Sequence, residues 1–368
     1  MPGVYIAYPF CAQKCTYCNF ASGVLPRDLE GPYVDALVRE LRVTAWPWIP
    51  ETVYLGGGTP SRLDPGSLAA LLAAIPGRPY LEATLEAAPA TFPHSHAALW
   101  REAGINRVSL GVQSFVESES RRSGRRHTAQ NVAEDVAALR RAGIENFNID
   151  LIAGLPGQTS ASWRTSLEST ARLAAPHVSL YMLEIDEDSR LGREVLFNGE
   201  RYGAPDVPSE SAITDFYETA VDFLQAEGIE RYEISNFARP GFASLHNLKY
   251  WQLAPYLGFG ADAHSFDGIS RWANVEDAAE YVRLVEAGLS PRTTPEPAHL
   301  SEEKFFVSLR LASGIRPTAA ERERYSAPLD RFLAEGLLEE RDGALRLTNR
   351  GVLLSNEVFQ EFLQPCPQ

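Results

Sequence analysis

Over the first 228 residues, short apolar runs alternate with longer runs in which apolar positions recur every three or four residues. The short runs are typical of strands, and the longer ones have the period of helices with one buried face. Strands are predicted at residues 4–8, 52–55, 80–86, 107–111, 147–152 and 177–183. Helices are predicted at residues 33–45, 65–75, 95–103, 129–142, 161–173 and 210–226.

This regular succession predicts an α/β fold with a parallel sheet and right-handed crossovers. A partial (β/α)₆ barrel is the best match, and a flat doubly wound sheet is the competing architecture. Two helix starts carry clear signals: Asp64 precedes Pro65, and Thr128 precedes the fourth helix. Both residues are suited to accept hydrogen bonds from the first turn of a helix.

The alternation stops near residue 229, which predicts a core at residues 1–230 and a smaller α+β domain at 231–368. From about residue 300 the pattern is helix, helix and then two short apolar runs separated by Asp342-Gly343. Asp-Gly between strands is a hairpin signal. The tail is therefore expected to be a winged-helix-like module, and its acidic residues favour a covering or docking role.

Three cysteines, Cys11, Cys15 and Cys18, follow the first predicted strand with the spacing C-x₃-C-x₂-C. Three thiolates suit a [4Fe–4S] cluster in which one iron keeps an open position for another ligand. A zinc site and three unconnected thiols are the alternatives. A structural zinc site normally has four ligands, but the next cysteine is Cys366 and the nearest histidine is His94. The cluster is therefore favoured.

Polar residues and glycines also gather where the predicted strands end. Functional groups of parallel α/β proteins collect at the carboxyl ends of the strands. Each residue taken alone is more simply explained as part of a turn, but together they indicate one binding rim. Carboxylates there could bind hydroxyls or an amine, and an arginine could bind a carboxylate. These residues are Gly56, Gly57, Gly58 and Thr59 after the second strand, then Glu86, Gln113, Ser114, Arg125 and Asp150.

The composition excludes several classes of partner. The net charge of −14 argues against nonspecific nucleic-acid binding, which requires a cationic surface. No apolar run reaches the roughly 18 residues of a transmembrane helix. The amino terminus lacks the charged and apolar regions of a signal peptide, so a cytoplasmic protein is expected.

The cysteine motif, with the aromatic Tyr17 before the third cysteine, resembles that of the radical S-adenosylmethionine (SAM) superfamily. In that superfamily the open iron binds the amine and carboxylate of SAM, and an electron from the cluster produces a 5′-deoxyadenosyl radical. The segments YIAYPFC, YLGGGTP, RVSLGVQSF, NIDLIAGLPGQT and HVSLYMLEI together resemble the coproporphyrinogen oxidase-like branch over nearly the whole chain. The resemblance implies SAM contacts at Tyr5, Tyr17, Gly57, Gly58, Thr59, Glu86, Gln113, Arg125 and Asp150.

That branch contains an oxygen-independent coproporphyrinogen III oxidase and a haem chaperone. The oxidase resembles C-x₃-C-x₂-C-x-C with an amino-terminal extension, whereas here Phe20 takes the place of the last cysteine and almost no extension precedes the first strand. Both features favour the chaperone. The segment HNLKYW, with His246, Tyr250 and Trp251, resembles the HNxxYW signature of the chaperone.

The resemblance implies a haem site at HNLKYW, with His246 as iron ligand. The alternative is that His246 hydrogen-bonds a loop while the two aromatic residues fill a core. His264 is a secondary ligand candidate in GFGADAHSF, where Asp262 replaces an expected small residue.

The function expected from this resemblance is a chaperone that binds one [4Fe–4S] cluster, SAM and haem. Its partners would be an electron donor and haem-acceptor apoproteins, such as respiratory cytochromes or haem-storing proteins. Oxidative decarboxylation of coproporphyrinogen III is the alternative enzymatic function. A zinc-stabilised scaffold is a third, less favoured class.

Overall fold

The computed structural model describes residues 2–363. Its first six strands are parallel and lie side by side in the order of the chain. A doubly wound sheet would reverse its strand order at a switch point, so the sequential order confirms the partial barrel. These strands are β1 (Gly3–Tyr8), β2 (Thr52–Gly57), β3 (Glu82–Ala87), β4 (Arg107–Gln113), β5 (Asn146–Ala153) and β6 (His177–Met182).

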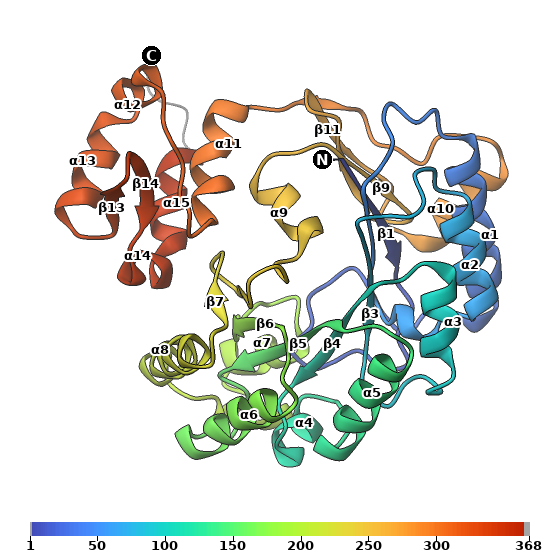
Figure 1. Cartoon of the computed structure of the whole chain (residues 1–368), viewed down its shortest axis with the longest axis horizontal. Coiled ribbons are helices and arrows are strands. Elements are labelled where there is room, and N and C mark those ends of the chain that lie inside the picture. The colour runs from blue at the N-terminus through green and yellow to red at the C-terminus, as the bar shows by residue number, and fades with distance from the viewer. Residues whose placement is uncertain (1, 364–368) are drawn as a thin grey trace.

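The connecting helices surround the strands on the outer side of the sheet (Figure 1). The six predicted helices are present, although the first begins earlier than expected and contains Pro32. They are α1 (Arg27–Val43), α2 (Pro65–Ala73), α3 (His96–Ala103), α5 (Ala129–Arg141), α6 (Ser160–Arg172) and α8 (Glu210–Ala226). Two short helices were not predicted, α4 (Glu117–Arg122) and α7 (Arg190–Leu196).

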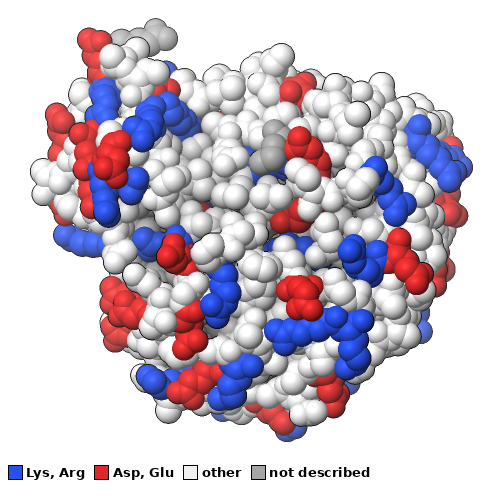
Figure 2. Space-filling view, viewed as in Figure 1, with Lys and Arg blue, Asp and Glu red and all other residues white. Residues whose placement is uncertain are grey.

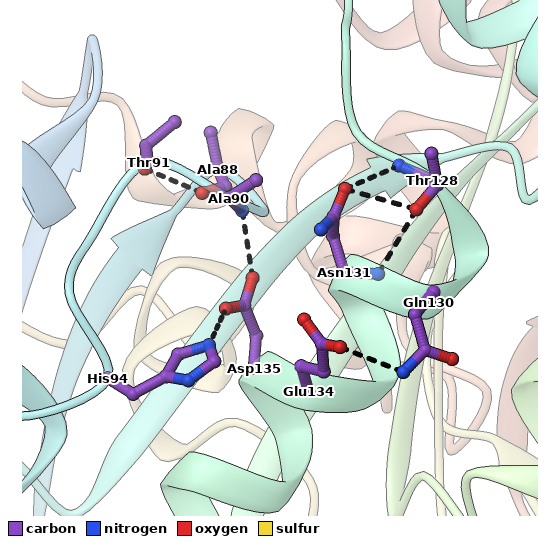
Figure 3. A network of polar contacts seen from close by, with 9 residues as sticks. All are labelled: Ala88, Ala90, Thr91, His94, Thr128, Gln130, Asn131, Glu134 and Asp135. Atoms are coloured by element: carbon purple, nitrogen blue, oxygen red, sulfur yellow. Dashed lines mark hydrogen bonds and ion pairs between the residues drawn. The ribbon is translucent and has the colours of Figure 1, made fainter.

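Both predicted helix starts are confirmed. The Asp64 carboxylate accepts a hydrogen bond from Ser67 N at 3.0 Å. Thr128 and Asn131 form a reciprocal capping box at the start of α5 (Figure 3). One helical turn further on, the buried Asp135 accepts a hydrogen bond from Ala90 N at 2.9 Å. Helix α5 thereby fixes the loop that follows β3, the strand that carries Glu86.

The two faces of the barrel strands differ in chemistry. The outer face is apolar and packs under the helices, as Val53 and Leu55 of β2 show with no exposed surface. The inner face carries polar side chains at alternate positions, including Tyr54, Asn148 and Asp150, which are joined by hydrogen bonds to their neighbours. Strands buried on both faces are usually apolar throughout, so this inner face is built to surround polar groups.

The chain after residue 229 extends the same sheet at both ends. The short strand β8 pairs antiparallel with β6, and β9 pairs parallel with β1. The division at residue 230 stays a prediction, although the sheet is continuous across it. The added strands are β7 (Glu230–Arg231), β8 (Asn236–Ala238), β9 (Tyr256–Phe259), β10 (His264–Phe266), β11 (Ser270–Ala273) and β12 (Glu296–Pro297), with helices α9 (Leu245–Trp251) and α10 (Ala278–Glu286).

The remaining residues form a separate cluster of elements, seen at the upper left of Figure 1. The hairpin is confirmed: Asp342 and Gly343 connect its strands with φ values of 53° and 71°, as a type I′ turn requires. Acidic and basic side chains are interspersed over this part of the surface (Figure 2), and some form ion pairs such as Arg331–Glu361. The elements are α11 (Leu300–Phe306), α12 (Ala319–Arg324), α13 (Ser326–Ala334), β13 (Leu338–Arg341), β14 (Ala344–Leu347), α14 (Asn349–Leu353) and α15 (Ser355–Leu363).

Cys366 lies outside the described residues. Within residues 2–363, no helix has the length and apolar character needed to cross a membrane.

Candidate functional site

The three cysteines lie on one loop, residues 9–23, that leaves the carboxyl end of β1. We call it the cysteine loop. Its two ends are joined because Cys11 N donates to Gly23 O at 2.8 Å and Gly23 N donates to Pro9 O at 2.9 Å. In its middle, Cys18 N donates to Cys15 O at 3.3 Å. All three cysteines are free and half-buried, so the loop is closed while its thiols remain reachable.

Two neighbouring segments fix the middle of the cysteine loop. Thr16 N donates to Ser123 O at 3.0 Å, and Thr16 O accepts from Leu191 N of α7 at 2.8 Å. The Arg190 guanidinium, also in α7, donates to Lys14 O. The unpredicted helix α7 thus supports the loop from the side of β6.

The donor set fits an iron–sulfur cluster. Burial raises the pKa of the Cys11 and Cys18 thiols, and the neighbouring thiols raise it further. Hydrogen bonds from Ser22 and Thr59 act in the opposite direction at Cys11. No three His, Cys, Asp or Glu side chains in residues 2–363 converge as ligands of a single metal ion would. A cubane cluster has wider ligand spacing, because each cysteine binds a different iron.

The glycine triplet after β2 packs directly against the cysteine loop. Gly58 N donates to Tyr8 O at 2.7 Å, and Thr59 N donates to Phe10 O at 3.0 Å. A Cβ atom on Gly58 would lie only 2.6 Å from Phe10 O. Gly57 has a φ of 105°, a conformation that other residues rarely adopt. The absence of a side chain at Gly58 therefore allows the backbone after β2 to pack closely against the cysteine loop.

A cavity of about 150 Å³ opens beside the cysteine loop at the strand ends; we call it the strand-end pocket. Glu86 is anchored at its wall, since its carboxylate accepts from the Tyr54 hydroxyl at 2.8 Å and from Gly57 N at 3.2 Å. Burial is the main reason that the pKa of Glu86 rises to about 7. The lining residues are Tyr5, Ala7, Pro9, Phe20, Ala21, Gly57, Glu86, Ala261 and Asp262.

A second polar group, formed by Asp150 and Arg125, lies near Glu86, because β4 pairs directly with β3 and the charge of Asp150 adds to burial in raising the pKa of Glu86. Arg125 Nε donates to the Tyr17 hydroxyl at 3.2 Å. Burial raises the pKa of Asp150, and the positive charge of Arg125 is one of the effects that oppose this rise. Gln113 has a φ of 68°, and its buried Oε1 has no hydrogen-bond partner within residues 2–363. The predicted SAM residues thus gather around the cysteine loop, with an unpaired polar atom among them.

Sequence reasoning missed Tyr54 as a support of Glu86 and did not assign a role to Asp262. The available signal for Tyr54 was the alternation of polar and apolar residues along β2 to β6, which is unusual for strands under a layer of helices. Asp262 comes from the turn after β9, and β9 lies beside β1 only because of a distant strand pairing. No local pattern could indicate that pairing.

The HNLKYW segment lies at the opposite end of the barrel. It forms α9, whose start is fixed when the backbone N–H groups of Leu245 and His246 donate to the Glu82 carboxylate at 2.8 and 2.9 Å. Glu82 is the first residue of β3, and Thr52, which α9 also contacts, is the first residue of β2. The segment therefore caps the amino-terminal end of the strands.

His246 is only 1% exposed, and both ring nitrogens have partners. Nδ1 lies 2.9 Å from the Thr52 hydroxyl, Nε2 lies 2.9 Å from the Tyr250 hydroxyl, and the ring stacks on Tyr54. Trp251 is covered by Arg310, whose guanidinium carbon lies 4.7 Å from the ring centroid. This geometry favours the structural alternative for His246, and its role as an iron ligand stays a prediction. The exposed His264 lies on β10.

Comparison with known proteins places this site in a class. The description "Radical SAM superfamily" matches residues 5–169, which include the cysteine loop, the glycine triplet and Asp150. The solved structure of coproporphyrinogen III oxidase (HemN) from Escherichia coli has the same fold, with a TM-score of 0.82 and 20% identity. That match covers 98% of this chain and 89% of the oxidase chain. Together with the relatives in sequence described next, the fold and the matched segment define a protein of the radical SAM superfamily.

Relatives closer in sequence include several proteins named heme chaperone HemW. Heme chaperone HemW from Bacillus subtilis is 34% identical, and the alignment covers 99% of both chains. Heme chaperone HemW from Escherichia coli is 31% identical over 98% of this chain and 97% of its own. The chain belongs to the HemW family within the HemN/HemW branch of the superfamily.

Proposed function

We propose that this protein is a haem chaperone that carries one [4Fe–4S] cluster and SAM beside the cysteine loop and passes haem to acceptor apoproteins. The observation that carries the proposal is the full-length similarity to proteins named heme chaperone HemW. The residue at position 20 agrees with it, because Phe20 stands where the oxidase-like motif has another cysteine.

Different residues of the site would bind the cluster and SAM. Cys11, Cys15 and Cys18 would bind the cluster, with Ser22 and Thr59 as hydroxyl neighbours of Cys11. Bound together, the cluster and SAM supply one-electron chemistry. Glu86 offers a carboxylate for a cationic or hydroxyl group of the ligand.

Outside the lining of the pocket, Arg125 and Asp150 offer two opposite charges, and Arg125 donates a hydrogen bond to the Tyr17 hydroxyl. Tyr5 and Phe20 contribute aromatic rings to the lining of the pocket. We propose that these positions, with Gly57, Gly58 and Gln113, surround SAM.

Anaerobic reconstitution of wild-type protein and of single cysteine variants tests the cluster. Cys11→Ala, Cys15→Ala and Cys18→Ala should each lose most of their iron and acid-labile sulfide, while Cys366→Ala should retain both. Stoichiometric zinc in wild type, with neither iron nor sulfide, would instead support a zinc scaffold. Iron content unchanged in Cys15→Ala would contradict the ligand assignment.

Haem titration of the same preparations tests the cargo. Wild type should bind haem with a Soret band distinct from that of free haem. His246→Ala should keep that spectrum, because its ring nitrogens are already bonded within the protein, whereas His264→Ala tests the exposed imidazole. An altered Soret band in the His246 variant, with His264→Ala unchanged, would restore His246 as the ligand. A wild type that binds no haem would contradict the chaperone function.

A further inference from the structure

We propose that Asp262 sets the ligand specificity of the strand-end pocket, by placing a carboxylate against the positively charged sulfonium of SAM. The inference rests on the proposed function, which puts SAM in this pocket. It concerns a residue outside the segment that matches the superfamily, since that match ends at residue 169.

The fold brings Asp262 to the pocket from a distant part of the chain. Strand β9 pairs with β1 in parallel, with Gly258 opposite Tyr5, so the turn after β9 emerges beside the cysteine loop. Asp262 N donates to Val275 O at 3.0 Å, which fixes the backbone of that turn. The Asp262 side chain then lines the cavity together with Glu86.

The backbone at this position is one that suits glycine. Asp262 has a φ of 57°, in the left-handed region that non-glycine residues occupy rarely, although Asp tolerates it better than most. A glycine would fit there without strain. The conformation therefore does not require Asp262, and the side chain needs another explanation.

The charge of the pocket offers an explanation for the side chain of Asp262. Its lining includes two carboxylates, Glu86 and Asp262, and contains no Lys, Arg or His. Glu86 is hydrogen-bonded by Tyr54 and Gly57, whereas the Asp262 carboxylate makes no hydrogen bond or ion pair with any residue in the described range 2–363. Both negative charges reach Tyr5, where they add to burial in raising the pKa of the phenol. A half-buried, unpaired carboxylate facing a cavity favours a cationic ligand.

The chemistry of SAM identifies the group that Asp262 would face. SAM carries two positive charges, the α-ammonium and the sulfonium. In the binding mode of the superfamily the amine is a ligand of the open iron, so the sulfonium is the cation that remains. S-adenosylhomocysteine has the same amino acid and nucleoside but a neutral sulfur. Comparing the binding of the two compounds therefore measures the contribution of the sulfonium charge.

Calorimetric titration of the reconstituted protein with both compounds tests the inference. Asp262→Asn keeps the shape and removes the charge, and Asp262→Gly removes the side chain while suiting the backbone. Each should weaken SAM binding by about tenfold, as loss of a charged contact typically does, and S-adenosylhomocysteine binding by less than about twofold. Glu276→Gln removes an exposed charge nearby and serves as the matched control. The absorbance of the cluster shows that each variant is assembled.

Two results would overturn the inference: SAM affinity unchanged in both Asp262 variants, or equal losses for SAM and S-adenosylhomocysteine. Either leaves the proposed function intact, provided that wild type binds SAM. A reconstituted wild type that binds no SAM would instead contradict the proposed function, and the role of Asp262 with it.

Discussion

Glu86 is the residue whose ionisation bears most directly on the strand-end pocket. Its pKa is raised to about 7, chiefly by burial, with Tyr54 and Gly57 N opposing the rise through hydrogen bonds. A cationic ligand favours the ionised carboxylate. SAM affinity should therefore rise by about tenfold between pH 6 and pH 8, as the ionised fraction of Glu86 does. Calorimetry over this range measures it.

Glu86→Gln provides the control for this pH dependence. The variant should bind SAM weakly and with a flatter pH profile, in which only the titration of the ligand's own amine remains. The raised pKa also has a consequence for folding: the protonated form contributes stability below pH 4.5, and this contribution is lost as the pH rises through about 7. Glu86→Gln should consequently be no less stable than wild type at pH 8. If SAM affinity depended on pH identically in wild type and in Glu86→Gln, Glu86 would be excluded from contact with SAM.

His246 should matter for stability more than for haem ligation. Replacement by alanine removes two hydrogen bonds and a stacked ring from a site that is 1% exposed, and should cost about 2–4 kcal/mol in the free energy of unfolding. Urea denaturation of the apoprotein measures this. The matched change at the exposed His264 should cost less than about 0.5 kcal/mol.

The pKa of His246 is lowered to about 3, first by burial and then by the charges of Lys249 and Arg107. The unfolded chain takes up a proton near pH 6.5 that the folded protein does not. His246 should therefore reduce stability progressively as the pH falls from 6.5 towards 3, and His246→Ala should reduce that part of the dependence. Equal acid sensitivity in wild type and variant would contradict the buried neutral state.

At the residue scale, the sequence places some side chains better than others. That Cys11, Cys15 and Cys18 share one loop could be predicted because their spacing is local along the chain, and their role as cluster ligands stays a prediction. His246 was open to two interpretations, since its environment depends on Thr52 and Tyr54, which lie nearly 200 residues away in sequence. Spacing carries no information about such partners.

Among the elements, the contact between the glycine triplet and the cysteine loop is the least tolerant of change. A methyl group at Gly58 would meet Tyr8 O at 2.8 Å and Phe10 O at 2.6 Å, distances that require the backbone to shift. Gly58→Ala should therefore lower iron and sulfide content after reconstitution, and not SAM affinity alone.

Gly23→Ala is the matched control for this change. Gly23 lies on the same cysteine loop, but a Cβ atom there would meet no atom within 4 Å. Its cluster content should equal that of wild type. Equal cluster content in Gly58→Ala would show that the loop tolerates displacement and that the glycine serves only the ligand.

The barrel elements themselves were largely predictable, because each strand and helix of the repeated unit carries its own periodicity. The six strands lie within a few residues of their expected bounds. Helix α7 was missed because its seven residues are too few to show a helical period, and its contact with Thr16 is non-local. The position of β9 beside β1 was missed for the same reason.

On the scale of the whole molecule, the barrel has two differently built ends. The strand-end pocket and the cysteine loop lie at the carboxyl ends of the strands. Helix α9 caps the amino-terminal ends and touches the carboxy-terminal module through Trp251 and Arg310 of the 3₁₀ helix η3 (Ser308–Arg310). This separation predicts that variants in α9 retain their cluster, which iron analysis of His246→Ala checks.

The haem chaperone function itself is tested most directly by haem transfer under anaerobic conditions. Reconstituted protein loaded with haem is mixed with an apo-haemoprotein, and the Soret spectrum of the separated acceptor is measured; a parallel sample receives coproporphyrinogen III, SAM and reductant. The account predicts that the acceptor gains haem faster than from free haem, and that no decarboxylated porphyrinogen forms. Turnover of coproporphyrinogen, with no haem delivered to the acceptor, would contradict it.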